Sequence, residues 1–323
     1  MGESVKEMLL RLDKERSNLR DLLNWTSGHP GVPRELREHG LHIAAGVWRY
    51  WYLRNHLSEG ARLLRAALDA CAAAPPELRA RAAYGAGVLA MTQADFRAAQ
   101  LMLEMGLLAA RECGSAELIA NILNSLGILT YSQGEYDQAR QYHQGALQLR
   151  EQAGDEHGVG ASLHNLGSVE HRLERWAEGD SLIRKSLQIF ERLGSPHPIA
   201  GAVASLAESA AQRGELDRAA DLYRNAATAY VGLGDRAFLS IVVEGLAGIA
   251  VRLGEAARSV RLCAAAESMR ERSGAGPASE ENRRSVRQTL SAARLALDGG
   301  AFHEAWDAGR RLSDSEALAE AGC

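Results

Sequence analysis

Cysteine, proline and aromatic residues are all scarce in this chain, and each scarcity narrows the range of possible structures. The 323 residues include only 4 cysteines and 7 prolines, and 5% of the residues are Phe, Trp or Tyr. Cys71, Cys113, Cys263 and Cys323 lie far apart and form no CxxC pair, so we expect neither a disulfide framework nor a zinc site. Val, Ile, Phe and Tyr are sparse while Ala and Leu abound, so the sequence favours helix almost everywhere.

Long apolar runs and basic clusters are also lacking. No run approaches the ~18 apolar residues that cross a bilayer, and the N-terminal MGESVKEMLLRLDKERSNLR lacks the apolar stretch of a signal peptide. The net charge is −4, and Lys and Arg are interleaved with Asp and Glu along the chain. A nucleic-acid-binding surface needs a basic patch, which is missing here. We therefore expect a cytoplasmic protein that binds neither membranes nor nucleic acid directly.

A 40-residue repeat fills the middle of the chain. Five copies align on their opening residues, which are spaced by 40 residues each time, and a more degenerate copy begins at Gly46. The five read YGAGVLAMTQADFRAAQLMLEMGL from Tyr84, NSLGILTYSQGEYDQARQYHQGAL from Asn124, HNLGSVEHRLERWAEGDSLIRKSL from His164, ASLAESAAQRGELDRAADLYRNAA from Ala204 and EGLAGIAVRLGEAARSVRLCAAAE from Glu244. A fixed period of this length is the signature of a stacked repeat architecture.

The turn and helix-end residues within each copy predict a pair of helices. Two amphipathic stretches flank a turn such as Gln133-Gly134-Glu135, and the second stretch ends at a glycine followed by Ser or Asp, as in Gly114-Ser115 and Gly154-Asp155. Glycine tolerates the left-handed position that ends a helix, while Ser or Asp can accept the unpaired amide hydrogens of the next helix. We therefore predict an all-α chain of about six helix-turn-helix hairpins.

This pattern resembles the tetratricopeptide repeat, in which a Leu-Gly pair of the first helix meets small residues of the second. The matching residues are Leu126-Gly127, Tyr136, Ala139 and Ala146 in the third copy, and Leu166-Gly167 and Trp176 in the fourth. The departures are Gly179 and Ser186 in place of alanines, Glu170 in place of an aromatic residue, Ala86 in place of Leu and Ala207 in place of Gly. The resemblance implies an α-solenoid, a right-handed superhelix.

The 40-residue form, longer than the family's usual repeat, is similar to the repeats at the C-terminal end of large bacterial transcriptional regulators and signal-transduction ATPases. The segment LDKERSNLRDLLNW, from Leu12 to Trp25, resembles the helix that links those repeats to an ATPase or winged-helix module. The tail around Phe302 and Trp306 resembles their closing segment. We accordingly expect a linker helix over residues 1–30, a repeat array over 31–273 and capping helices over 274–323, since a last repeat exposes an apolar face.

Two histidines in the fourth copy raise the question of a site. His164, Ser168 and His171 are spaced to share one face of a helix, and in the resembled family that face of the first helix lines the concave groove. The candidate groove residues at this and equivalent positions are Arg49, Tyr52, Arg81, Tyr84, Asn121, Asn124, Tyr131, His164, Ser168, His171, Arg172, Glu208, Gln212, Glu244 and Arg252. Each histidine can also be a packed or solvated side chain without a binding role.

Metal binding and catalysis have little support. Seven residues rise ~10.5 Å along a helix, too far for His164 and His171 to share one ion at ~2.1 Å. The sequence has no GxxxxGK[ST], HExxH or GxSxG motif. We expect no catalytic residues, no metal and no cofactor.

Three functions remain open. The leading one is a non-catalytic sensor part of a bacterial transcriptional regulator that binds a peptide, a protein segment or a small-molecule effector in its groove. The second is a stand-alone scaffold or adaptor, and a homo-oligomer is possible in either case. The third is an enzyme using His164, His171, Glu208 and Glu244 as acid/base groups, which we rank last because helical solenoids mainly supply extended binding surfaces.

Overall fold

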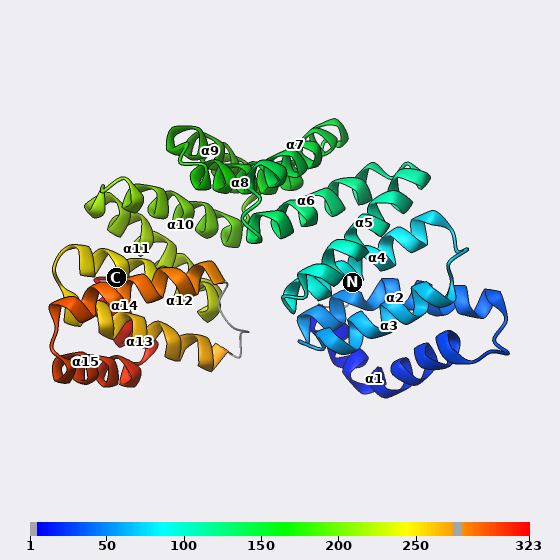
Figure 1. Cartoon of the computed structure of the whole chain (residues 1–323), viewed down its shortest axis with the longest axis horizontal. Helices are drawn as coiled ribbons and strands as arrows, with labels where there is room; N and C mark the ends of the chain where they lie inside the picture. Colours follow the sequence, from blue (N-terminus) through cyan, green and yellow to red (C-terminus); the bar gives the residue numbers. More distant parts are fainter. Residues whose placement is uncertain (1–4, 274–279) are drawn as a thin grey trace. The chain divides into compact units, whose positions relative to one another are not determined.

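The computed structural model describes residues 5–273 and 280–323, and in these ranges every regular element is a helix. The helices are α1 (Val5–Gly28), α2 (Arg34–Leu53), α3 (Leu57–Ala70), α4 (Pro76–Thr92), α5 (Phe96–Cys113), α6 (Ala116–Ser132), α7 (Tyr136–Ala153), α8 (Glu156–Arg172), α9 (Trp176–Leu193), α10 (Pro196–Gln212), α11 (Leu216–Leu233), α12 (Arg236–Arg252), α13 (Ala256–Ser273), α14 (Glu280–Ala296), α15 (Gly299–Arg311) and α16 (Asp314–Glu320). The described part of the chain is all-α, as predicted (Figure 1).

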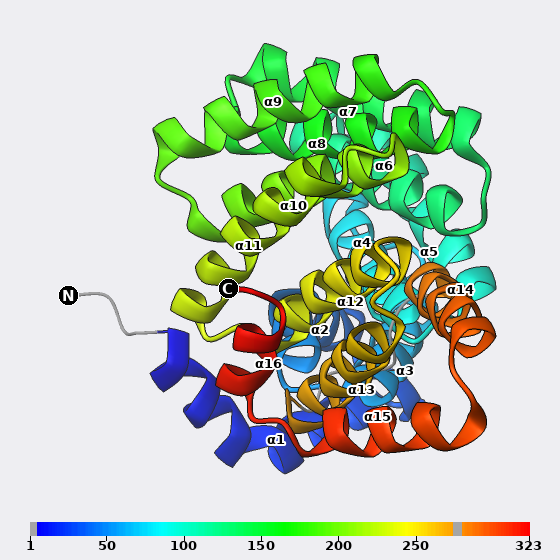
Figure 2. The ribbon, with the colours of Figure 1, turned by 90° about the vertical axis from the view of Figure 1, so that its left-hand side faces the viewer.

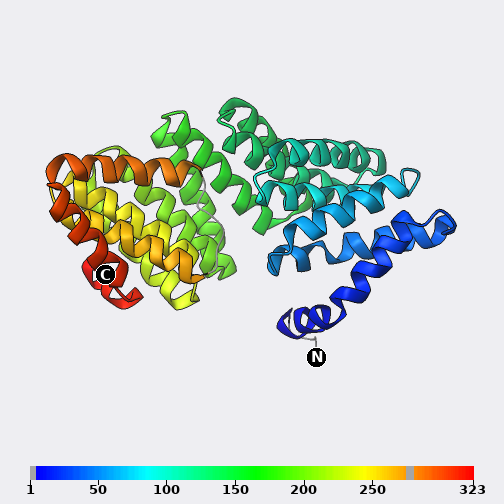
Figure 3. The ribbon, with the colours of Figure 1, turned by 60° about the horizontal axis from the view of Figure 1, so that its bottom comes forward.

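Consecutive helices from α2 to α13 pack as six hairpins, which confirms the predicted helical repeat. The chain divides into two compact units, Met1–Asp155 and Glu156–Cys323, which we call the N-terminal unit and the C-terminal unit. The N-terminal unit holds α1 and three hairpins, with α1 against α2 and α3 (Figure 3). The C-terminal unit holds the other three hairpins and α14 to α16. The expected division at residues 30 and 273 stays a prediction.

Glycines end the second helices where the sequence places them. Gly114, Gly154, Gly194 and Gly234 have φ between +61° and +70°, the left-handed conformation that glycine adopts without strain. After Gly114 and Gly234, the side chains of Ser115 and Asp235 accept hydrogen bonds from the backbone amides of Leu118 and Phe238. The 40-residue spacing of these signals therefore fixes where the helices begin and end.

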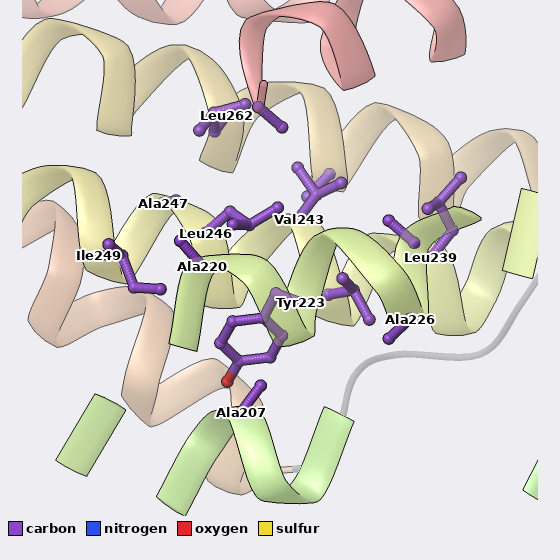
Figure 4. Packing of buried hydrophobic residues seen from close by; sticks show 14 of the residues in the cluster. Ala207, Ala220, Tyr223, Ala226, Leu239, Val243, Leu246, Ala247, Ile249 and Leu262 are labelled. Carbon is purple, nitrogen blue, oxygen red and sulfur yellow. The ribbon is translucent and has the colours of Figure 1, made fainter. Parts of the chain in front are cut away.

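A second set of glycines brings the two helices of a hairpin close together. A Cβ on Gly87, Gly127 or Gly167 of the first helix would lie 2.7, 2.6 or 2.5 Å from the Leu103, His143 or Ile183 side chain of the second. In the next hairpin Ala207 takes the glycine's place and lies beside Tyr223 in the core of the C-terminal unit (Figure 4). The glycine or alanine at this position of the first helix thus marks a close-packing site.

The C-terminal helices cover the last hairpin of their unit. α14 packs along α12 and α13, and α15 lies beside α13 (Figures 1 and 2). Gly309 of α15 meets the backbone of Arg261 so closely that a side chain would have no room. Arg261 in turn contacts Glu320 at 2.6 Å, and Asp314 bridges Arg236 and Arg272 at 2.7 and 2.6 Å. Packing and several partly exposed ion pairs together hold this covering layer on the repeat.

None of the described helices is both long and apolar enough to cross a membrane.

Candidate functional site

One stripe of each first helix stays partly open to solvent. Neighbouring first helices contact each other within each unit, α4 with α6 and α10 with both α8 and α12. We call this stripe the first-helix face. Its predicted members that are at least partly exposed are Arg49, Tyr52, Arg81, Tyr84, Asn121, Asn124 and Tyr131 in the N-terminal unit, and His164, Ser168, Arg172, Glu208, Gln212, Glu244 and Arg252 in the C-terminal unit.

Aromatic rings gather at the start of the first-helix face. Trp48 of α2 has its ring centroid 5.5 Å from Tyr84 of α4 and 6.4 Å from Tyr52, which is 46% exposed. The Arg49 guanidinium lies 5.4 Å from the Trp48 ring, within cation–π range. Arg81 is exposed and paired with Glu77 at 2.7 Å. These residues offer flat rings and two guanidinium groups, of which that of Arg81 is paired with Glu77, to a ligand.

On α6 the first-helix face carries two side-chain amides, those of Asn121 and Asn124. Asn121 Oδ1 accepts a hydrogen bond of 3.1 Å from Nη2 of Arg150, which reaches across from α7. Arg150 is 7% exposed, and its burial lowers the pKa of the guanidinium. Asn124 is half-buried, and Tyr131 stacks edge-on against Tyr136 at 5.6 Å. A buried cation beside two amides suits recognition of a backbone carbonyl or carboxylate oxygen.

In the C-terminal unit, polar side chains link α8 to α10. His164 Nε2 lies 3.0 Å from the Ser205 hydroxyl, and Arg172 pairs with Glu208 at 3.1 Å. Burial lowers the pKa of His164 below its ordinary value, which favours the neutral ring. The Ser168 hydroxyl donates to the His164 carbonyl at 3.1 Å. The predicted residues of these two helices therefore meet on one surface, apart from His171.

The structure places His171 inside its hairpin instead of on the open face. The side chain is buried between α8 and α9, with Nε2 3.1 Å from Oδ1 of Asp180 and the ring 5.5 Å from Trp176. Gly179 lies directly against the ring. The seven-residue spacing places His171 on the same side of α8 as His164. At this end of α8, however, that side packs against Trp176 and Asp180 of α9. The expectation that His171 would be accessible in the groove is therefore corrected.

The last three predicted residues lie where the face is partly covered. Glu244 is paired with Arg270 of its own hairpin, and burial raises the pKa of its carboxyl group. Arg252 donates to the carbonyl oxygen of Ala211, while Gln212 is exposed. Beside them α14 covers α12, because a Cβ on Gly248 would lie 3.6 Å from the Thr289 hydroxyl. The open part of the face in this unit thus consists mainly of α8 and α10.

Sequence reasoning missed residues at the other end of these helices. The rings of His157 and Phe190 are 5.3 Å apart, and those of His197 and Phe238 are 4.7 Å apart. His197 Nε2 also lies 3.2 Å from Asp235. Phe238 is 43% and the neighbouring Ile241 39% exposed, so this end offers apolar surface. The available signal was the 40-residue spacing of the two histidines, each paired with an aromatic ring.

Two hollows of the described surface lie away from the predicted residues. One of about 110 Å³ is lined by side chains of α3 to α5, including Ser58 and Met102. Another of about 520 Å³ lies at the start of α9, beside Trp176 and Arg213. No cluster of three metal-ligating side chains was found among the described residues. The arrangement therefore offers an extended surface of rings, amides and charges.

A tetratricopeptide repeat family model matches residues 118–178 and 158–231. No curated protein matches the sequence. The match spans the third to fifth copies of the repeat, from α6 to α11.

Three solved structures illustrate the likeness of fold. A Rap protein complexed with competence and sporulation factor superposes with a TM-score of 0.63 at 14% identity, covering 99% of this chain and 89% of that one. A signal-transduction ATPase with a tetratricopeptide repeat sensor, from Pyrococcus horikoshii, gives 0.60 at 12%, covering 93% of this chain and 46% of that one. The apo quorum sensor NprR from B. thuringiensis gives 0.58 at 16%, covering 89% and 83%.

At these identities the likeness concerns the fold alone. Together with the family match and the 40-residue hairpins, it identifies a tetratricopeptide repeat domain in this chain.

Proposed function

We propose that the chain is a non-catalytic binding module whose first-helix face holds an extended segment of a peptide or protein. One observation carries the proposal: Asn121, held by the buried Arg150, lies on the same face as the aromatic group of Trp48 and Tyr84. Amides can hydrogen-bond a peptide backbone, and rings can cover its apolar side chains. Several weak contacts along a face suit an extended ligand.

An extended ligand is favoured over an enclosed small molecule. Pockets for drug-sized molecules usually measure about 300–1,000 Å³ and enclose most of the ligand. The hollow at Ser58 and Met102 is about 110 Å³, and the larger one at the start of α9 is an open depression. Neither includes a residue of the first-helix face, so a small-molecule effector has less support.

We further propose that the module is the sensor part of a bacterial transcriptional regulator. The Rap structure is a complex with competence and sporulation factor and NprR is described as a quorum sensor, and both share this fold. The alternative is a stand-alone scaffold or adaptor, which needs the same face. The two differ in their context: a regulator requires an ATPase or DNA-binding module in the same or a neighbouring reading frame, and its absence would favour the adaptor.

Peptide selection tests the binding role. Random peptides displayed on phage are selected on the purified chain, and the enriched peptides are measured by calorimetry against wild type, Tyr84→Ala and Asn121→Ala. We expect each variant to weaken binding at least about tenfold, the usual size of a loss at a central contact. Gln100→Ala, an exposed change on the second helix α5, is the control and should change the affinity less than about twofold. Failure to enrich any peptide, or equal binding by all variants, would contradict the proposal.

A further inference from the structure

The second helix α5 carries an apolar stripe that nothing in its own unit covers. Leu101, Met105 and Leu108 follow one another at the spacing of a single helix face and are 61%, 36% and 68% exposed. Exposed leucines scattered singly are ordinary, but a continuous stripe of large apolar side chains indicates a contact surface.

The internal repeat shows that this stripe is unusual for its position. The equivalent residues are Gln141, Gly145 and Gln148 in α7, Ser181, Lys185 and Gln188 in α9, and Asp221, Asn225 and Thr228 in α11. Those three helices therefore present polar or small residues where α5 presents large apolar ones. The hairpin does not need leucine here for its own packing, because the other hairpins form without it.

The last hairpin shows what such a face can hold. In α13 the equivalent residues are Arg261, Ala265 and Ser268, and this face is covered by the helix α15. Gly309 of α15 lies on the backbone of Arg261, and the Ser268 hydroxyl donates to the Arg310 carbonyl at 3.4 Å. The outer face of a second helix is therefore a surface on which another helix can pack.

The charges at the two ends of the stripe match a second copy of the same helix. Arg97 precedes Leu101 by four residues and Glu112 follows Leu108 by four. When two α5 helices run antiparallel about a two-fold axis between Glu104 and Met105, Leu101 of one faces Leu108 of the other. The same axis places each Arg97 opposite the Glu112 of the second copy. An isologous interface needs this kind of self-complementarity.

Both charged groups are available for such a contact. Arg97 is exposed and forms no ion pair with any residue that the structure describes. Glu112 pairs with Arg79 at 2.7 Å but stays 57% exposed, and a carboxylate can accept a second donor. We propose that the α5 stripe is a two-fold interface through which two copies of this chain associate, antiparallel at α5. One helix pair buries less than the roughly 1,200 Å² of a standard interface, so we expect a weak dimer with a micromolar dissociation constant.

Sedimentation equilibrium of the full chain, from roughly 1 to 500 µM, tests the dimer. We expect Leu101→Gln with Leu108→Gln to weaken dimerisation at least about tenfold, since glutamine stands at these positions in α7. Leu295→Gln, which removes a leucine that is 90% exposed on α14, is the matched control and should leave dimerisation unchanged. A chain that stays monomeric throughout, or a dimer that the double variant does not weaken, overturns the proposal.

The charges give a second, independent test of the geometry. Arg97→Glu and Glu112→Arg should each weaken self-association. In a dimer of either variant, residue 97 of each copy carries the same charge as the residue 112 that it faces, so two pairs of like charges repel. An equimolar mixture of the two variants should recover the wild-type affinity, since both cross-pairs are then of opposite sign. Single variants that associate as well as wild type would overturn the antiparallel arrangement, because a parallel pair already sets Arg97 against Arg97 and a charge reversal would leave like charges opposed. A mixture that does not recover the affinity would overturn it as well.

Discussion

His143 of α7 lies flat against Gly127 of α6, so close that a Cβ on the glycine would be 2.6 Å from the imidazole ring. The histidine is 1% exposed, and burial lowers its pKa to about 4. In the preceding hairpin the same place is taken by Leu103 against Gly87. The third hairpin thus holds a titratable ring where its neighbour holds a leucine.

The burial of His143 predicts that the N-terminal unit becomes less stable to unfolding as the pH falls. The folded-state pKa is lower than the unfolded value of about 6.5, so the unfolded chain binds the proton first as the pH falls. The contribution of His143 to the free energy of unfolding should therefore be constant above about pH 6.5 and fall between pH 6.5 and 4, by up to about 3 kcal/mol. His143→Leu should remove most of that fall, as measured by urea unfolding at several pH values. An unchanged pH profile in the variant would show that His143 is not the titrating group.

The contact between His171 and Gly179 predicts that substitutions at the two positions have non-additive effects on the free energy of unfolding. Gly179→Ala alone places a Cβ into the His171 ring and 2.8 Å from the Gly167 carbonyl oxygen, and should cost about 1–3 kcal/mol, the usual cost of overpacking. The next repeat has alanine at both equivalent positions, Ala211 and Ala219. His171→Ala combined with Gly179→Ala should therefore cost less than the sum of the single changes by at least about 1 kcal/mol. Additive costs in this double-mutant cycle would contradict the close contact.

The turn between α8 and α9 predicts a stabilising substitution. Glu174 has φ +60°, a left-handed conformation, whereas the equivalent residues Gly134, Gly214 and Gly254 are glycines with φ of +83° to +84°. Glu174→Gly should raise the free energy of unfolding by roughly 0.5–1 kcal/mol, because the strain relieved exceeds the added freedom of the unfolded chain. The reverse change, Gly134→Ala, should lower it by about 1 kcal/mol. A loss of stability in Glu174→Gly, measured by the urea midpoint, would count against backbone strain at this turn.

Much of the fold could be predicted from the sequence because its signals recur. The glycine at Gly114 and the Leu166-Gly167 pair act within one hairpin, and their 40-residue spacing turns weak local preferences into a consistent pattern. Tyr84, Asn121 and Arg172 of the predicted face lie partly open on first helices, and their role in binding stays a prediction.

What could not be predicted depends on contacts between elements distant in sequence. His171 was expected to be accessible because helical spacing says which side a residue occupies, but not what stands there; Asp180 and Trp176 of α9 occupy that side. The covering of Gly248 by Thr289 depends on where α14 packs. Arg150 beside Asn121 was missed because the arginine reaches the face from the second helix.

Photo-crosslinking tests the central claim, binding on the first-helix face, most directly. A photoreactive phenylalanine is placed at Tyr84 or Ser168 on this face, and at the exposed Gln100 or Gln188 on second helices, and each variant is irradiated with a peptide enriched by selection. Our account predicts crosslinks from position 84, position 168 or both, and none from positions 100 and 188. Crosslinks from positions 100 or 188 alone would place the ligand on the opposite side of the hairpins and contradict the account.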